Sequence, residues 1–167
     1  LAGGSGSRLY PLTKYVSKQL LPIYDKPMIY YPLSTLMLGG IRDILIISDS
    51  KNLESYKKLF GSGNQFGINL EYCIQEKPNG IAEAFILGED FIDKDNVTLI
   101  LGDNIFYGEK LQQLINESIA STLKGESVII GHRVSDPERY GVAVINKKNK
   151  VVEVQEKPQK PKSDIAI

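Results

Sequence analysis

The sequence is poor in cysteine, in net charge and in long hydrophobic runs. Its one cysteine, Cys73, excludes an intramolecular disulfide framework and favours a reducing compartment, and the apolar residues around it predict a core position. Twenty basic and twenty acidic residues cancel, and because they are scattered, no overall field favours nucleic acid or an anionic membrane as a partner. Any recognition of phosphate must therefore be local.

Hydrophobic runs stay short of the roughly 20 residues that a membrane-spanning helix needs, and no basic stretch with an apolar segment precedes a cleavage site. We therefore expect a cytoplasmic protein with no membrane partner. With 167 residues and 42% hydrophobic content, the chain is expected to form one globular domain over residues 1–167. LAGG resembles the last turn of a strand and KSDIAI restarts an apolar run, so we expect a chain truncated at both ends.

Short apolar runs alternate with helical patterns along most of the chain, which is typical of repeated βαβ units. Because the runs are continuous rather than alternating, they predict strands of a parallel sheet buried on both faces, at 43–49, 70–75, 97–103 and 127–134. Amphipathic spacing predicts helices at 28–38, 53–60, 81–91 and 109–123. After Gly141, two alternating runs flank the polar turn NKKN, which predicts an antiparallel β-hairpin.

The chain opens with the glycine-rich stretch LAGGSGSRLYPLT. Gly3, Gly4 and Gly6 would let backbone N–H groups approach an oxyanion closely, although an ordinary glycine turn has the same composition. The stretch lacks the Lys-Ser/Thr pair of a P-loop and the third glycine of the dinucleotide-binding fingerprint. These differences argue against a P-loop NTPase and against a dehydrogenase.

Two basic residues follow the glycines, and one acidic residue ends the expected strand at 97–103. Arg8 offers a planar fork for phosphate oxygens and Lys18 a mobile point charge, which together suit a ligand with several phosphates. Asp103, at the carboxyl end of a strand, lies where open α/β sheets bind ligands and is a natural Mg²⁺ ligand beside phosphates. The alternatives are solvated surface charges for the two basic residues and a helix cap for Asp103.

At these residues the sequence resembles the sugar nucleotidyltransferases, the nucleoside-diphosphate-sugar pyrophosphorylases. The resemblance runs over all 167 residues and also includes SKQLLPI, DKPMIYYPLSTL, QEKPNGIAEAF, LGDNIFYG, DPERYGV and VVEVQEKP. It implies the nucleotide-diphospho-sugar transferase fold, a Rossmann-like three-layer α/β/α sandwich with a mostly parallel central sheet. The 167 residues would form the N-terminal part of that family's catalytic domain, with the C-terminal part absent.

The resemblance also implies an activity. A phosphate oxygen of glucose 1-phosphate would attack the α-phosphorus of dTTP in line, giving dTDP-glucose and pyrophosphate with Mg²⁺ as the cofactor. This reaction serves nucleotide-sugar biosynthesis for cell-surface polysaccharides, and the family implies a homo-oligomer acting on small molecules only. Such a reaction needs no covalent nucleophile, because positioning and charge neutralisation supply most of the catalysis.

Site residues are carried over from the family by matching motifs. The resemblance assigns the catalytic role to Arg8, Lys18, Asp103 and Lys157, with Asp103 as the metal ligand. For nucleotide binding it assigns Leu1, Ala2, Gly3, Gly4, Gly6, Gln75, Pro78 and Gly80. For sugar binding it assigns Asn104, Gly141, Glu156 and Lys157. A second metal-binding aspartate belongs to the family's C-terminal half, and no residue of this sequence matches it.

Two other functions fit the same residues. A related enzyme that uses UTP or another nucleoside triphosphate would keep the glycine loop and Asp103 but change the contacts to the base. A non-catalytic module that binds a nucleotide sugar would need no second metal carboxylate. His132 has no partner at a suggestive spacing, and we assign it no catalytic role.

Overall fold

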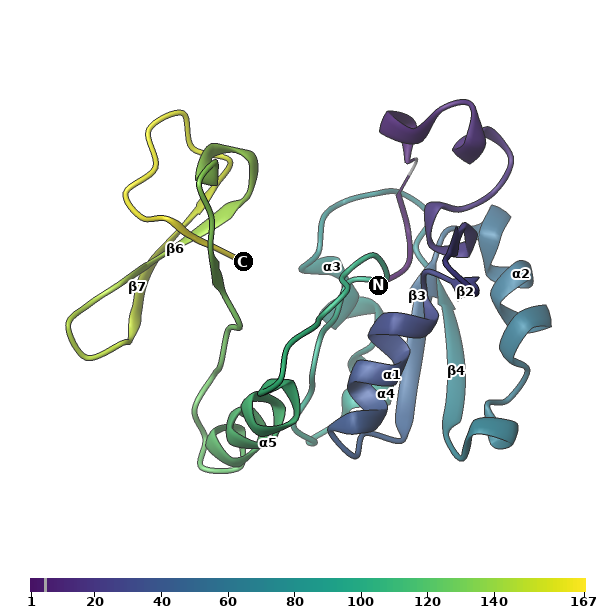
Figure 1. Cartoon of the computed structure of the whole chain (residues 1–167). Helices are drawn as coiled ribbons and strands as arrows, with labels where there is room; N and C mark the ends of the chain where they lie inside the picture. Colours follow the sequence, from purple (N-terminus) through teal and green to yellow (C-terminus); the bar gives the residue numbers. More distant parts are fainter. Residues whose placement is uncertain (5) are drawn as a thin grey trace. The chain divides into compact units, whose positions relative to one another are not determined.

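The computed structural model describes residues 1–4 and 6–167 and has an α/β architecture. It divides into two compact units, Leu1–Leu123 and Lys124–Ile167 (Figure 1). The first unit contains a parallel sheet with helices, and the second contains an antiparallel sheet with the hairpin. Each unit is described by itself below.

Two parallel strands form the centre of the first unit: β3 (Asp43–Ser48) and β4 (Asn69–Ile74) pair in register from Asp43↔Asn69 to Ser48↔Ile74. Alternate side chains point to opposite faces of the sheet. Ile44, Ile46 and Leu70 join a core cluster with residues of α1 (Tyr30–Leu38) and α2 (Ser50–Phe60). These two helices therefore cover the same face.

The other face of this sheet is covered by α3 (Glu83–Leu87) and α4 (Glu89–Ile92). The Sγ of Cys73 lies 3.9 Å from the carbonyl oxygen of Leu87, and Gly88 packs near Leu45. Helix, sheet and helix layers follow one another, which confirms the three-layer expectation. Cys73 is only half-buried, so the prediction of a core position was too strong, because the short helices α3 and α4 leave part of β4 uncovered.

Local signals explain where α2 begins and ends. The side chain of Asp49 accepts a hydrogen bond from the backbone N–H of Asn52 at 2.9 Å, which is an N-cap contact. Leu53, Tyr56 and Phe60 form the buried stripe at helical spacing. The helix ends at Gly61, whose φ of 54° suits glycine.

The predicted strand at 97–103 is not a regular strand in the described structure. It runs beside the first residues of the chain: the Leu1 nitrogen donates to the Ile100 carbonyl at 2.9 Å, and Gly102 N donates to the Leu1 carbonyl at 2.8 Å. This is the bond pattern of a parallel pair. On the other side, Ala2 N donates to the Ile47 carbonyl at 2.7 Å. Pairing stops after these few bonds because Gly3 and Gly4 turn into the loop.

Several predicted boundaries also differ from the structure. The predicted helix at 81–91 divides at Gly88 into α3 and α4, since glycine is a poor interior helix residue. The predicted helix at 109–123 is α5 (Leu111–Thr122), which contacts the end of α1 through Ile115 and Gly39. The described residues of the first unit also form short 3₁₀ turns at Ser7–Leu9, Leu12–Lys14, Lys18–Leu20 and Asn64–Phe66. A two-stranded antiparallel ribbon pairs β1 (Pro22–Ile23) with β2 (Lys26–Pro27).

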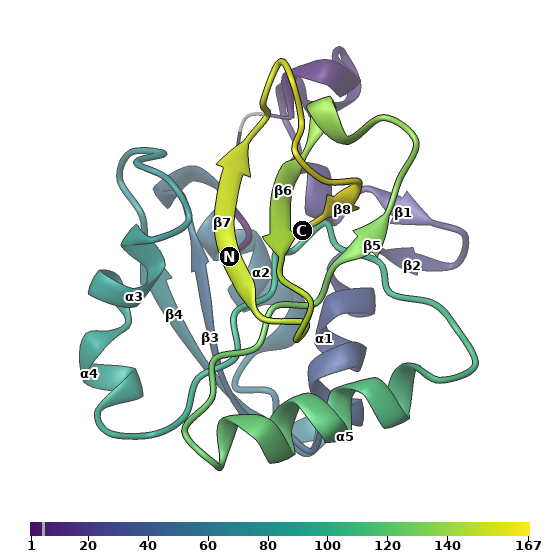
Figure 2. The ribbon, with the colours of Figure 1, turned by 90° about the vertical axis from the view of Figure 1, so that its left-hand side faces the viewer.

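The second unit contains a four-stranded antiparallel sheet in the order β5-β8-β6-β7 (Figure 2). Its strands are β5 (His132–Arg133), β6 (Gly141–Ile145), β7 (Val151–Glu156) and β8 (Ile165–Ala166), and a 3₁₀ turn spans Pro137–Arg139. Strands β6 and β7 confirm the predicted hairpin; Asn146 Oδ1 accepts from the N–H groups of Lys148 and Lys150 in its turn. The predicted strand at 127–134 is reduced to β5, because its partner β8 pairs over only two residues.

Within residues 1–4 and 6–167, no helix has both the length and the apolar character that crossing a membrane requires.

Candidate functional site

The glycine loop borders a cavity of about 260 Å³ at the carboxyl ends of the parallel segments in the first unit. Gly6 has a φ of 57°, and a Cβ added there would lie 3.0 Å from Thr13 Cγ2. Thr13 Oγ1 donates to the Gly6 carbonyl at 2.6 Å, so the loop is tied to a buried side chain. The described residues around this cavity are Gly3, Gly4, Gly6, Ser7, Arg8, Leu9, Lys18, Gln19 and Asp103.

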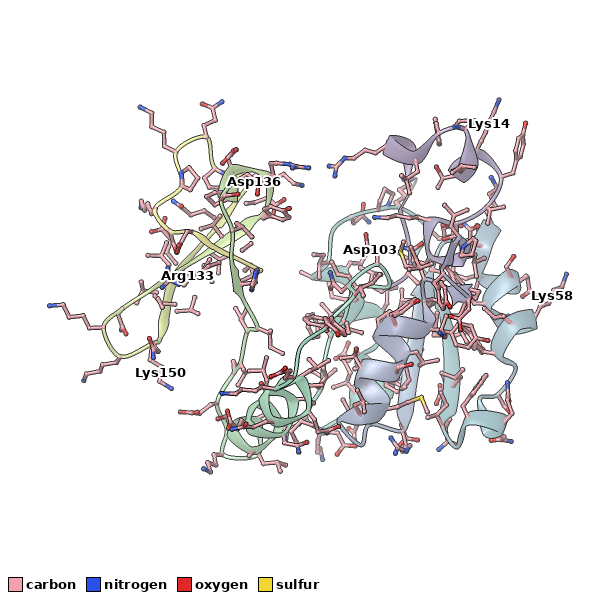
Figure 3. The ribbon with its side chains drawn as sticks, in the orientation of Figure 1. Lys14, Lys58, Asp103, Arg133, Asp136 and Lys150 are labelled. Atoms are coloured by element: carbon pink, nitrogen blue, oxygen red, sulfur yellow. The ribbon has the colours of Figure 1, made fainter. Side chains whose placement is uncertain are left out.

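Lys18 and Asp103, 85 positions apart in sequence, form an ion pair at this cavity. Lys18 Nζ donates to Asp103 Oδ2 at 2.8 Å, and each side chain is about one-third exposed. Figure 3 shows Asp103 on the loop that follows residues 100–102. The alternative role as a helix cap is wrong, because α5 begins at Leu111 and its N-cap residue is Lys110, with no side-chain bond.

Arg8 also lines the cavity but is exposed, on the 3₁₀ turn Ser7–Leu9. Among the described residues it forms no ion pair. Its guanidinium therefore keeps its hydrogen-bond donors available for an anion.

Among the described residues that line this cavity, Asp103 supplies the one carboxylate for a metal ion. Within the part of the chain that the structure describes, no three His, Cys, Asp or Glu side chains gather as metal ligands. Mg²⁺ commonly takes one or two protein carboxylates and completes its octahedron with water and phosphate oxygens. Asp103, about one-third exposed beside a cavity with two cationic side chains, fits that kind of site.

A buried polar network lies beneath the loop, and sequence reasoning missed it. Ser48 Oγ donates to the Ala2 carbonyl at 2.8 Å, and Tyr56 Oη lies 3.2 Å from the same carbonyl. Gln19 Nε2 donates to the Gly3 carbonyl at 3.1 Å. Ser17 joins Tyr56 to Gln19. One signal was available: a polar residue at the end of the buried run DILIIS and a tyrosine on the buried stripe of α2 both need partners.

The second cavity, of about 530 Å³, adjoins the loop on the side of Gln75. Gln75 is 7% exposed and follows β4 directly; its Nε2 donates to Glu83 Oε2 at 2.6 Å, with the Gly80 carbonyl at 3.4 Å. Its Oε1 faces Gly3, 3.6 Å from where a Cβ would lie. Hydrogen bonds from Asn79 and Gln75 lower the pKa of Glu83, which keeps that carboxylate an acceptor. Pro78 lines this cavity as well.

The remaining predicted residues of the first unit lie around these cavities. Leu1 and Ala2 run between β3 and residues 100–102, and Ala2 is buried. Asn104 Oδ1 accepts from Leu101 N at 3.3 Å, and Asn104 N donates to the Leu101 carbonyl, so Asn104 shapes the turn that carries Asp103.

The predicted sugar-binding residues of the second unit lie together at one end of the hairpin. Gly141 is opposite Glu156 in the register of β6 and β7. Lys157 follows with a φ of 40°, and its N–H donates to the Tyr140 carbonyl at 3.0 Å. Lys157 Nζ pairs with Glu156 Oε1 at 2.9 Å, and both side chains are more than half exposed.

Fold and site together define an α/β protein with its cavities at the carboxyl ends of parallel segments, where open α/β sheets bind ligands. The chain belongs to the nucleotidyl transferase family, whose model matches residues 1–167. It is 54% identical over 167 residues to the glucose-1-phosphate thymidylyltransferase of Neisseria meningitidis and 48% identical over 169 residues to that of Mycolicibacterium smegmatis. Each match covers all of this chain but 57% of the relative, so the chain spans somewhat more than half their length.

Solved structures agree with this assignment. A structure from Bacillus anthracis, assigned as a glucose-1-phosphate thymidylyltransferase in complex with sucrose, is 40% identical with a TM-score of 0.89 over 99% of this chain and 66% of that one. An apo UDP-glucose pyrophosphorylase is 22% identical with a TM-score of 0.83 over 99% of this chain and 71% of that one. The second likeness concerns the fold alone.

Proposed function

We propose that this chain forms the N-terminal part of one catalytic domain that transfers a thymidylyl group from dTTP to glucose 1-phosphate. The observation that carries the proposal is one cavity bordered by the glycine loop, Arg8, Lys18 and Asp103. Relatives with 54% and 48% identity carry the name of that activity. The reaction releases pyrophosphate and gives dTDP-glucose, a precursor in cell-surface polysaccharide biosynthesis.

The triphosphate would bind at the first cavity. Gly3, Gly4 and Gly6 permit close approach of the backbone, and Arg8 and Lys18 supply positive charge for the phosphate oxygens. Asp103 would hold Mg²⁺ with help from phosphate oxygens and water. Bound there, Mg²⁺ would neutralise charge on the phosphate groups. For Lys18 this requires a change of partner, because it is paired with Asp103 in this structure.

The base would occupy the second cavity, where Gln75 can select it. Because Nε2 of Gln75 is held by Glu83, Oε1 remains as an acceptor facing the glycine loop. An acceptor suits the N3–H of thymine or uracil and repels the N3 lone pair of cytosine. Pro78 and the Gly80 carbonyl complete this side, with Leu1 and Ala2 contributing backbone.

For the sugar phosphate we propose Lys157 as the phosphate contact and Glu156, Gly141 and Asn104 as sugar contacts. An oxygen of the sugar phosphate attacks the α-phosphorus in line, and pyrophosphate leaves from the opposite side, so no covalent intermediate forms. Catalysis rests on positioning and on fixed positive charge around the transferring group. We also propose that the protein is cytoplasmic and forms a homo-oligomer. Mass photometry of the purified protein would check the oligomeric state.

The test is incubation of the complete polypeptide that carries these 167 residues with glucose 1-phosphate and each of dTTP, UTP, ATP and GTP. Pyrophosphate release is followed with and without Mg²⁺. We expect Mg²⁺-dependent release that is fastest with dTTP. Fastest release with UTP would reassign the enzyme to another nucleotide sugar, and binding of dTDP-glucose without any release would indicate a non-catalytic module.

A further inference from the structure

We infer that Ser17 is a positioning residue whose hydroxyl, fixed by Tyr56, holds Gln19 on the Gly3 carbonyl and so sets both the glycine loop and Lys18. This inference rests on the proposed function for the role of the cavity. The family-derived site residues do not include Ser17 or Tyr56.

The contacts form a directed chain of hydrogen bonds. Ser17 Oγ donates its one proton to Gln19 Oε1 at 2.6 Å, so toward Tyr56 it is an acceptor and Tyr56 Oη donates at 2.8 Å. Gln19 Nε2 then donates to the Gly3 carbonyl at 3.1 Å. Tyr56 Oη also lies 3.2 Å from the Ala2 carbonyl. Each link of this chain depends on the orientation of the one before it.

Burial makes this chain of bonds specific. Ser17, Gln19 and Tyr56 are 5%, 3% and 0% exposed, so water has little access to replace a lost partner. Burial raises the pKa of Tyr56 to about 12, still further above physiological pH than its ordinary value of 10, so the hydroxyl stays protonated. The donor at the start of the chain is therefore permanent.

The geometry connects this network to the charged groups of the cavity. Ser17 and Gln19 flank Lys18, and while they point inward, Lys18 reaches Asp103 at the cavity. Gln19 also fills the space beside Gly102, where an added Cβ would lie 3.0 Å from Gln19 Cγ. A shift of Gln19 would move the Gly3 loop, the backbone of Lys18 and the segment before Asp103 together.

The experiment compares Ser17→Ala with Ser34→Ala, both in the complete polypeptide. Ser34 is the matched control because it is exposed on α1, its hydroxyl donates to the Tyr30 carbonyl at 2.7 Å, and it lines neither cavity. We expect Ser17→Ala to lower kcat by about tenfold, since small misplacements at a reacting centre are costly. dTTP affinity, measured by calorimetry, should weaken by about threefold, and Ser34→Ala should change neither.

Two further variants separate positioning from a purely structural role. Tyr56→Phe leaves the Ser17–Gln19 bond in place, so we expect a smaller loss of kcat than for Ser17→Ala and a larger one than for the control Tyr72→Phe. The Tyr72 hydroxyl donates to the Gly61 carbonyl at the C-terminal end of α2, opposite to the end at which Asp49 lines the second cavity. Ser17→Thr, which keeps the hydroxyl, should recover most of the kcat lost in Ser17→Ala.

The inference is overturned if Ser17→Ala lowers the melting temperature but keeps the kcat and the dTTP affinity of Ser34→Ala. If Ser17→Ala does not fold, equal kcat and affinity for Tyr56→Phe and Tyr72→Phe overturn it instead. Absence of pyrophosphate release by the unaltered protein would refute the proposed function, and the dTTP affinities of the same variants would still decide the positioning role.

Discussion

The two units hold their proposed ligand-binding residues in different ways. In the first, Ser17, Gln19, Ser48 and Tyr56 are all under 6% exposed and hold the carbonyls of the loop from beneath. In the second, Glu156 and Lys157 are exposed, and the side chain of each bonds the other. The proposed nucleotide cavity is therefore preorganised, whereas the hairpin fixes backbone positions and leaves its charged side chains adaptable.

This difference suits the two proposed substrates. Stabilisation of a transferring phosphoryl group depends on charges that are already in place, because reorganisation at the moment of reaction is costly. A sugar phosphate can instead be bound by side chains that reorient upon binding, at some cost in side-chain entropy. Changes in the first unit should therefore affect turnover, and changes in the hairpin end should leave folding almost untouched.

The largest effect is expected from Asp103→Asn. The change keeps the shape but removes the charge that would hold Mg²⁺, so turnover should fall by roughly 10² to 10³, the scale for losing one electrostatic stabiliser. Pyrophosphate release as a function of Mg²⁺ concentration measures this, with the melting temperature as the folding control. Near-normal Mg²⁺-dependent turnover would remove Asp103 from the metal site.

Arg8→Lys should have the next largest effect. A point charge cannot reproduce the planar, bidentate contact of a guanidinium, and losing one charge-assisted hydrogen bond costs about 1.5 to 3 kcal/mol. We expect kcat and kcat/KM to fall together, the pattern of an interaction made mainly in the transition state. Lys18→Ala should instead raise the KM for dTTP more than it lowers kcat. An unchanged kcat for Arg8→Lys would make this arginine a surface charge.

Gln75→Ala tests the reading of the base. Leaving polar atoms of the base unpaired should cost about 1 to 3 kcal/mol in kcat/KM with dTTP. UTP should lose as much, because its base presents the same N3–H, and the gap between these two and ATP or GTP should narrow. Equal losses with all four triphosphates would show that Gln75 supports the cavity wall without reading the base.

Ser48→Ala tests how much the buried network contributes to the free energy of unfolding. Ser48 is buried, and its hydroxyl donates to the Ala2 carbonyl, which Tyr56 Oη also approaches at 3.2 Å. The free energy of unfolding should therefore fall by about 1 kcal/mol, the net worth of one hydrogen bond. Urea unfolding measures it, with Ser34→Ala as control. A loss no greater than that of the control would mean that the network contributes little to stability.

The sequence predicted most of this arrangement, and the exceptions have physical causes. β3, β4, α2 and the hairpin follow from apolar runs and polar turns whose signals are local. Residues 97–103 were predicted as a strand from their composition. Regular strand pairing also depends on the neighbouring segment, and here only Leu1 pairs with this stretch before the chain turns into the glycine loop. Arg8 and Lys18 were predicted from their place after the glycines, and Asp103 from its place at the end of an apolar run; the structure brings all three to one cavity.

The buried network was missed for a different reason. Ser17, Ser48 and Tyr56 become partners only when segments up to 54 positions apart meet around the Ala2 carbonyl. No spacing in the sequence encodes that meeting, and each residue has an ordinary local interpretation. For Gln75, likewise, its place at the end of β4 was predictable, but the engagement of its Nε2 by Glu83 was not.

The smallest effect is expected from Glu156→Gln, which tests whether the charged side chains at the end of the hairpin are adaptable. The pair with Lys157 is exposed on both sides, and exposed ion pairs contribute about 0 to 1 kcal/mol. Neutralising Glu156 should therefore change the free energy of unfolding by less than about 0.5 kcal/mol. At the same time the KM for glucose 1-phosphate should rise while the KM for dTTP stays constant, because only the proposed sugar contact is lost. Urea unfolding and the two KM values measure these effects side by side. A stability loss as large as that of Ser48→Ala would show that the hairpin end is as preorganised as the nucleotide cavity, and the contrast between the two units would then disappear.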